Sequence, residues 1–180
     1  MPIVTLHRPA LEELAFRQAL LDDPDTMAFN HAYGGTIAFP RERWADWYGR
    51  WVEDASGERF YRYLYDGEAD AFAGEVSYHL DEELGGYVCD VIVPAGLRGR
   101  GYGRQGLALL CQAAKGNGVP RLLDNIAPTW SRQASCCWVS PSSVRRARIS
   151  SPVFFASIFL TSGVYSQIIK EAAQKATYAP

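Results

Sequence analysis

The residues from Gly86 to Lys115 constrain the fold of this chain more than any other stretch. Their first part, Tyr87 to Val93, is rich in Val and Ile and predicts a buried strand. A loop with alternating glycines follows, at Gly99, Gly101 and Gly103, and then apolar residues recur at helical spacing. Glycines let a ligand approach the backbone, and the free amides at a helix start favour negative charge. Three basic residues border the loop: Arg98, Arg100 and Arg104. The stretch therefore predicts a site for a phosphate-bearing ligand.

Length and composition are those of a single domain. The 180 residues suffice for a hydrophobic core without disulfides, and the formal charge of −2 argues against a nucleic-acid partner. The four cysteines lack metal-ligand spacing, so no metal is expected. No apolar run reaches the roughly 18 residues of a membrane span, and the first residues do not resemble a signal peptide. We therefore expect a cytoplasmic protein without membrane contact.

The elements before residue 127 follow a regular order. Short connections between three successive strands favour an antiparallel meander, and a strand reached through a helix is expected to lie parallel to its predecessor. An aromatic stripe at Trp44, Trp47, Tyr48 and Trp51 predicts a helical face packed in the core. The expected strands are 3–6, 60–65, 71–80, 87–93 and 121–126; the expected helices begin at Pro9, at Pro40 and after the Gly-rich loop, and 27–39 is expected to be a loop.

This order resembles the GNAT superfamily of N-acetyltransferases. The acetyl-CoA motif of that family, Arg/Gln-x-x-Gly-x-Gly/Ala, corresponds to Arg-Gly-Arg-Gly-Tyr-Gly at Arg98 to Gly103. Residues 90–93 resemble the fourth strand of the family and residues 122–126 the fifth. The resemblance covers about residues 3–127 and implies an α/β (α+β) fold with a mixed, mostly antiparallel central sheet flanked by helices. Residues 1–180 then form one domain, with a family-like core at 1–127 and an atypical tail at 128–180.

The resemblance also implies a reaction and a cofactor site. An acceptor amine of a small molecule or peptide would attack the thioester of acetyl-CoA directly, in a ternary complex. The loop amides would hold the pyrophosphate of CoA, and the fourth strand, splayed from the fifth, would pair with the pantetheine arm. The expected cofactor-binding residues are Val91, Ile92, Val93, Arg98, Gly99, Arg100, Gly101, Tyr102, Gly103 and Arg104.

Two carboxylates are candidates for the base that deprotonates the amine. Asp90 lies inside an apolar strand, where a buried carboxylate is costly unless it is paired or functional, and Glu75 lies in the neighbouring strand. The structural alternative is that Asp90 points to solvent or pairs with an arginine. His31 and Tyr33 are candidates for the acceptor site, and no tyrosine is assigned as the general acid.

The residues after Pro128 depart from the family pattern. Nineteen of the 20 acidic residues lie at or before Asp124, so the first 124 residues carry a formal charge of −7 and the remainder +5. One hypothesis is that the tail is translated in a shifted frame, since plausible codons for residues 131–140, moved by two bases, can encode a helix ending in Gly-Phe. The other is genuine divergence. Within this tail, residues 153–160 predict a strand and residues 165–176 a helix.

Two other functions stay open at this point. The chain could bind CoA without catalysis, because the acceptor half of the family pattern is missing. A dinucleotide-binding protein is the second alternative, because Gly101 to Gly106 satisfies Gly-x-Gly-x-x-Gly after a strand. The Arg cluster at residues 145–148 is not expected to bind nucleic acid. A homodimer is compatible with the sequence, which does not determine the oligomeric state.

Overall fold

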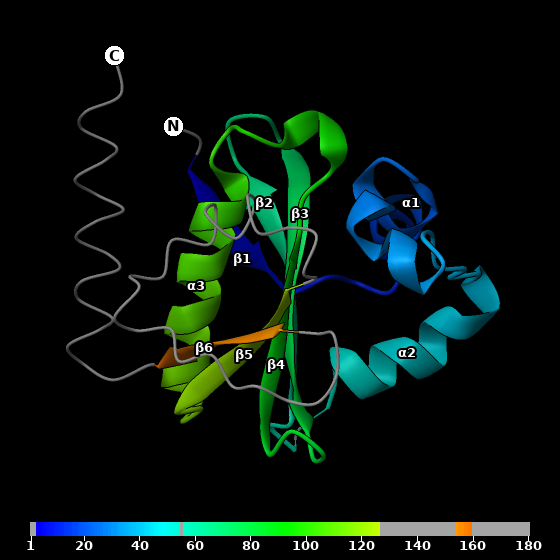
Figure 1. Ribbon diagram of the computed structural model, residues 1–180. Coiled ribbons are helices and arrows are strands. Elements are labelled where there is room, and N and C mark those ends of the chain that lie inside the picture. Colours follow the sequence, from blue (N-terminus) through cyan, green and yellow to red (C-terminus); the bar gives the residue numbers. More distant parts are fainter. Residues whose placement is uncertain (1–2, 55, 127–153, 160–180) are drawn as a thin grey trace.

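A mixed sheet forms the centre of the molecule (Figure 1). The computed structural model describes residues 3–54, 56–126 and 154–159, and within them six strands lie in the order β1-β2-β3-β4-β5-β6. Neighbouring strands are antiparallel except β4 and β5, which are parallel as predicted. The elements are β1 (Val4–His7), α1 (Leu14–Asp22), η1 (Thr26–Tyr33), η2 (Arg41–Arg43), α2 (Trp44–Trp51), β2 (Arg59–Asp66), β3 (Ala71–Asp81), β4 (Gly86–Ile92), η3 (Ala95–Leu97), α3 (Tyr102–Gly116), β5 (Arg121–Ile126) and β6 (Phe154–Phe159). The predicted fold class and the predicted strand at 153–160 are confirmed.

The helices cover the two faces of the sheet unequally. Helix α3 lies on one face, and α1 and α2 lie on the other (Figure 1). The core beneath α3 joins Val76 and Tyr78 of β3 to Leu110 of α3, all fully buried or nearly so. On the opposite face, Tyr61 and Tyr63 of β2 pack against aromatic residues of α2. The sheet thus separates two hydrophobic cores. The prediction that the aromatic stripe of α2 packs in the core is confirmed.

Helix α1 begins later than the sequence pattern indicates. We expected a helix from Pro9, but α1 starts at Leu14. The amides of residues 13–16 donate to the carbonyls three residues earlier, at 3.0 to 3.4 Å, so the chain forms i→i+3 turns before the α-helix. The Glu13 carboxylate holds the start of these turns by accepting from the Ala10 amide at 2.7 Å.

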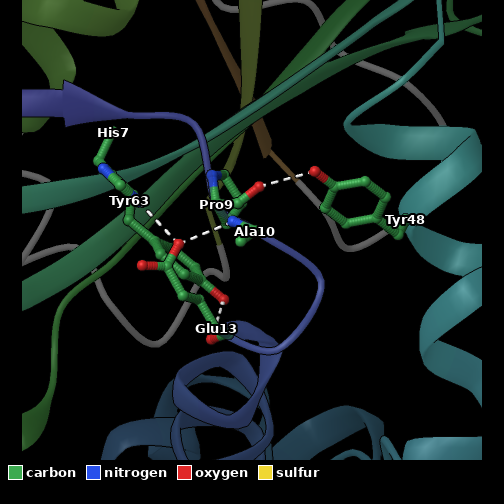
Figure 2. A network of polar contacts seen from close by, with 6 residues as sticks. All are labelled: His7, Pro9, Ala10, Glu13, Tyr48 and Tyr63. Atoms are coloured by element: carbon green, nitrogen blue, oxygen red, sulfur yellow. Dashed lines mark hydrogen bonds and ion pairs between the residues drawn. The ribbon is translucent and has the colours of Figure 1, made fainter.

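The same turn is tied to three other elements (Figure 2). The carboxylate of Glu13 pairs with His7 Nε2 at 2.7 Å, at the end of β1. Its backbone carbonyl accepts from Tyr63 Oη at 3.0 Å, and the carbonyl of Pro9 accepts from Tyr48 Oη at 2.9 Å. Two buried or half-buried tyrosines, from β2 and α2, therefore set the position of α1 against the sheet.

Residues 27–39, expected to be a loop, contain the 3₁₀ helix η1. Asp23 begins it by accepting hydrogen bonds from the Thr26 hydroxyl and amide, the latter at 3.2 Å. Met27 is buried, and Gly34 ends the helix in the left-handed conformation with φ of 107°. A 3₁₀ helix has no 3.6-residue period, so its apolar residues do not form the stripe by which an α-helix is predicted.

Candidate functional site

The pairing of β4 changes partway along the strand. β4 pairs with β5 only from Tyr87 to Cys89, whereas it pairs with β3 as far as Ile92. The segment 90–92 therefore has a neighbouring strand on one side only, and we call it the β4–β5 opening. Outward-facing amides and carbonyls of such a segment can pair with an added extended ligand. The predicted divergence of these two strands is confirmed, although Val93 lies one residue beyond the end of β4.

The loop after β4 presents a row of backbone amides. Gly99 and Gly101 have φ of 79° and 94°, and Gly101 caps the N-terminus of α3. Within the described part of the chain, the amides of residues 99–104, here called the anion loop, have no backbone acceptor besides the helix itself, and the first amides of a helix lack one by geometry. The first amide bonded back to the loop is that of Gln105, to the Gly101 carbonyl at 3.1 Å. Such a row favours a phosphate group.

Arg98 does not belong to this cradle, contrary to the sequence prediction. Its amide donates to the Ala95 carbonyl at 3.2 Å. Its guanidinium donates to the carbonyls of Thr26 at 2.6 Å and Asp25 at 3.2 Å. These carbonyls belong to the start of η1, so the side chain is directed at η1, and the free amides begin at Gly99.

Three further residues predicted for the cofactor have distinct positions. The ring of Tyr102 is buried, and its hydroxyl donates to Asp66 at 2.6 Å, which raises the pKa of Tyr102. Tyr102 therefore anchors α3 to the turn after β2, and only its amide faces the anion loop. Arg100 is exposed and Arg104 half-exposed, and neither forms an ion pair with the described residues. Both charges remain open to a phosphate.

The last glycine of the dinucleotide-like motif, Gly106, serves packing rather than a dinucleotide. A Cβ atom on Gly106 would lie 2.7 Å from Leu64 Cδ1 and 3.2 Å from Val76 Cγ1, so this glycine lets α3 approach the sheet closely. The motif follows the antiparallel pair β3–β4, whereas a dinucleotide fold places it after a parallel βαβ strand. The dinucleotide alternative is therefore wrong for this fold.

Asp90 occupies the start of the β4–β5 opening. It is paired with Ser77, which is paired in turn with Tyr61, so all three lie on the face covered by α1 and α2. The expectation of a buried carboxylate is wrong: Asp90 is exposed, because β5 no longer flanks the strand there. Desolvation by the surrounding protein raises its pKa, Glu75 adds to this, and His79 and Arg17 oppose it. Because Asp90 as a whole residue is exposed, solvent screens part of this effect.

Glu75, the second candidate base, is buried and fully engaged. It accepts hydrogen bonds from the guanidinium of Arg17 and from the hydroxyl of Tyr61. Burial raises the pKa of Tyr61 and works against the charge of Arg17, but Glu75 and Tyr61 together raise the pKa of Arg17. The guanidinium also stacks over Trp47, with Cζ 4.5 Å from the ring centroid. Of the two carboxylates, Asp90 is therefore the one that an acceptor can reach.

The two predicted acceptor-site residues are not brought to Asp90 by any described contact. His31 is exposed on η1, and the side chain of Tyr33 lies outside the described part of the structure. His79 of β3 lies on the face of Asp90, with its ring 5.6 Å from that of Trp51. Its Nδ1 atom is buried without a hydrogen-bond partner among the described residues.

Sequence reasoning missed Arg17 as part of this face. One signal existed: Arg17 stands three residues after Leu14 and four before Leu21, on the apolar stripe of α1. A charge on such a stripe indicates a buried partner. The partner itself, Glu75, lies 58 residues away and is identified only by the fold.

The strand divergence and the free amides of the anion loop suit a phosphate-bearing ligand with an extended arm. Comparison with known families agrees: the acetyltransferase (GNAT) family matches residues 13–134, more than half of the chain. The chain belongs to this family and is an acyltransferase. The expectations of an acetyltransferase and of acetyl-CoA as its cosubstrate are confirmed. The comparison with curated proteins found no match.

Solved structures of low sequence identity share the fold. A nucleotide-linked sugar GNAT, FdhC, has a TM-score of 0.69 at 11% identity and covers 94% of this chain and 93% of its own. The protein yncA from Salmonella typhimurium, with its cofactor acetyl-CoA, has a TM-score of 0.62 at 16% identity, covering 89% and 95%. Spermidine N-acetyltransferase from Vibrio cholerae, with CoA and spermine, has a TM-score of 0.62 at 14% identity, covering 91% and 98%.

The described residues contain neither a metal-ligand cluster nor a membrane-spanning helix. No group of three or more His, Cys, Asp or Glu side chains there is arranged to hold a metal ion. No helix in the described ranges combines the length and the apolar character needed to cross a membrane.

Proposed function

We propose that this chain transfers the acetyl group of acetyl-CoA to a primary amine by direct attack in a ternary complex. One observation carries the proposal: β4 leaves β5 after Cys89, with Asp90 at the start of the opening and the free amides of the anion loop beyond its end. A thioester lying along the opening would then pass the exposed residue Asp90. The match to the acetyltransferase family supports the same reaction.

Binding of the donor would use the backbone for most contacts. The pyrophosphate of CoA would accept hydrogen bonds from the amides of residues 99–104, assisted by the charges of Arg100 and Arg104. The pantetheine arm would pair with outward-facing groups of Val91 and Ile92 and with Val93 beyond them. Backbone amides need no particular side chains, so the glycines matter here by allowing close approach.

The chemistry requires a free amine. Asp90 would accept a proton from the ammonium of the acceptor, directly or through a water molecule. The nitrogen then attacks the thioester carbonyl carbon, the C–S bond breaks as the amide forms, and the thiolate of CoA leaves and takes up a proton. A raised pKa suits Asp90 to this role, because a carboxylate of higher pKa is the stronger base. Glu75 would support the site through Arg17 rather than act as base.

The acceptor would be a small-molecule or peptide amine held on the α1–α2 face. Asp90 supplies negative charge there, and Trp51 supplies an aromatic surface beside His79, a combination that suits a cationic amine. Among the solved structures, one protein is named for spermidine and another for a nucleotide-linked sugar, so the shared fold leaves the acceptor open. His31 and Tyr33 of η1 would border this site.

The test combines binding with turnover. CoA is expected to raise the Tm of the protein while NAD does not, and an amine panel including spermidine is expected to release free thiol from acetyl-CoA. Asp90→Asn is expected to lower kcat about 10²- to 10⁴-fold, the usual contribution of a general base, with little change in Tm. Glu75→Gln is the matched control, expected to lower Tm. Protection by NAD alone would refute the proposal, and an unchanged kcat in Asp90→Asn would refute the role of Asp90.

A second candidate, CoA binding without turnover, is favoured by the end of the family match at residue 134, shortly after Asp124, beyond which the chain has a single acidic residue. CoA protection without thiol release from any amine would support it. Sequencing the gene tests the frameshift hypothesis: it fails if no one- or two-base change restores a helix containing Gly-Phe. A homodimer stays a prediction, to be tested by light scattering.

A further inference from the structure

Hydrogen bonds join the start of η1 to the segment that leads into the anion loop. The amide of Ala95 donates to Thr26 Oγ1 at 2.9 Å. The guanidinium of Arg98 donates to the Thr26 carbonyl at 2.6 Å and to the Asp25 carbonyl at 3.2 Å. These four residues are here called the η1 latch. The bonded residues are 69 to 73 positions apart in sequence, so the latch is a tertiary link and not a local turn.

The hydroxyl of Thr26 is held in one orientation from both sides. Thr26 is fully buried, and its hydroxyl donates to the carboxylate of Asp23 while it accepts from Ala95. Asp23 also accepts from the amides of Asp25 and Thr26, each at 3.2 Å, which fixes the backbone that Arg98 contacts. A hydroxyl that donates and accepts in a buried place is poorly replaced by an apolar group, since a partner would then lack a hydrogen bond.

The η1 latch lies immediately before the anion loop in the chain. Ala95 and Arg98 are the two ends of the tight turn before the anion loop, and the Arg98 amide closes that turn on the Ala95 carbonyl. The loop that follows contains three glycines within five residues, and ordering glycine-rich backbone has a high entropic cost. An attachment immediately ahead of such a loop reduces the number of arrangements that it can adopt.

We propose that the η1 latch holds the anion loop in its binding arrangement and couples it to η1, which makes Thr26 and Arg98 positioning residues for the reaction. The inference rests on the proposed function, in that CoA is the ligand of the anion loop. Because η1 also carries His31, on the acceptor side, cofactor and acceptor would each raise the affinity of the other, as linkage requires. Arg98 acts through the backbone of η1 and not on a phosphate.

Three variants separate this role from phosphate binding. Thr26→Val removes the hydroxyl without touching any charge, Thr26→Ser keeps it, and Arg98→Met removes the guanidinium on the surface. Losing the two hydrogen bonds of the hydroxyl, with the Ala95 amide and the Asp23 carboxylate, lowers the population of the competent loop, so Thr26→Val is expected to raise the Kd for CoA about fivefold or more. Arg98→Met is expected to do at least the same, while Thr26→Ser stays near wild type. Arg100→Met is the comparison, because Arg100 is proposed to face phosphate.

Salt dependence and hydrogen exchange provide the readouts. Removing a phosphate ligand weakens the salt dependence of CoA binding, so Arg100→Met is expected to flatten it and Arg98→Met to leave it unchanged. CoA is expected to slow amide exchange in residues 26–37 of the wild type, of Thr26→Ser and of Arg100→Met, and to do so much less in Thr26→Val and Arg98→Met. The KM for the acceptor should rise in the latter two variants only.

The outcomes separate the two proposals. If the wild type does not bind CoA, the proposed function fails. If the wild type binds CoA and both latch variants match its Kd and exchange, the latch proposal is overturned. A flattened salt dependence in Arg98→Met equal to that in Arg100→Met would also overturn it, since Arg98 would then be a phosphate ligand. Should Thr26→Val not fold, Arg98→Met at the exposed position decides the question by the same measurements.

Discussion

The anion loop and the α1–α2 face of the sheet are built from different chemical groups. The anion loop is one continuous segment, residues 99–104, that presents backbone amides made accessible by glycines. The opposing face is assembled from side chains of α1, α2, β2, β3 and β4, with Arg17, Tyr61 and Glu75 as its buried polar centre. A common cosubstrate can be held by backbone, whereas an acceptor that varies among relatives requires side chains. Variants in either region should therefore fail in different ways.

The largest effect is expected from Arg17→Met, on the side-chain-built face. It leaves Glu75 buried without its cation, and breaking a buried pair in this way costs about 3–5 kcal/mol of unfolding free energy. Urea denaturation measures the loss. The double variant Arg17→Met/Glu75→Gln should recover part of it, because no uncompensated charge remains. Equal losses in the single and double variants would show that the ion pair is not what stabilises this face.

A smaller loss of stability is expected from Gly106→Ala, beneath the backbone-built site. The new Cβ would meet Leu64 Cδ1 at 2.7 Å in a place where Leu64 is fully buried, and overpacking of this kind costs about 1–3 kcal/mol. Gly116→Ala, in the same helix, is the control, because nothing lies within 4 Å of its Cβ position. Calorimetry should show a lower Tm for the first variant only. The same Tm for both would mean that α3 can shift without cost.

Gly101→Ala should affect binding more than folding. Gly101 has φ of 94°, and this left-handed conformation costs other residues about 1–2 kcal/mol. The loop is expected to relax away from its binding arrangement, which raises the Kd for CoA about tenfold. Gly96→Ala, at a position without positive φ and without neighbours within 4 Å, is the matched control for calorimetric titration. An unchanged Kd in Gly101→Ala would contradict a backbone-built cradle.

The smallest effect concerns pH and the turn before α1. Desolvation raises the pKa of Glu13. Hydrogen bonds from the Ala10 amide and His7, together with the charge of His7, lower it by a larger amount, so the pKa lies below its ordinary value of 4.5. A lowered carboxylate pKa stabilises the fold above the unfolded pKa and loses that effect as pH falls through the folded pKa. Glu13→Gln should therefore reduce Tm at pH 7 by a small amount, and the difference from wild type should disappear as pH falls through the lowered folded-state pKa of Glu13. A constant difference across that range would exclude the carboxylate as the cause.

Much of the fold was predictable because its signals are local. The strands at 60–65, 71–80 and 121–126 are all present to within one residue, and the helix predicted after the Gly-rich loop is α3. The parallel pairing of β5 followed from its helical connection. The start of α1 and the whole of η1 were not predicted, since Glu13 and Asp23 bond to backbone amides in ways that apolar periodicity does not record.

The candidate site likewise combines features that one chain segment predicts with features that depend on tertiary neighbours. Residues 91 and 92 and the loop glycines could be predicted as a backbone surface from one chain segment, because a cradle of amides needs glycines at neighbouring positions. Arg98 and Asp90 were identified with the wrong surroundings: one contacts η1 and the other faces solvent. Their neighbours come from elements far away in sequence. The predicted helix at 165–176 and the tail from residue 129 lie outside the described residues, apart from β6.

By itself, the sequence determined the order of the elements and the family, and it predicted a backbone site for the cosubstrate, because glycine spacing and apolar periods express short-range constraints along one chain segment. Only the tertiary structure decided which of the two candidate carboxylates, Glu75 or Asp90, belongs to an exposed residue. Glu75 and Asp90 are equivalent in a strand pattern, but Arg17 and Tyr61 reach the first, while the end of β5 pairing exposes the second. The charge state and reach of a side chain depend on its neighbours in space, and the fold alone brings those neighbours together.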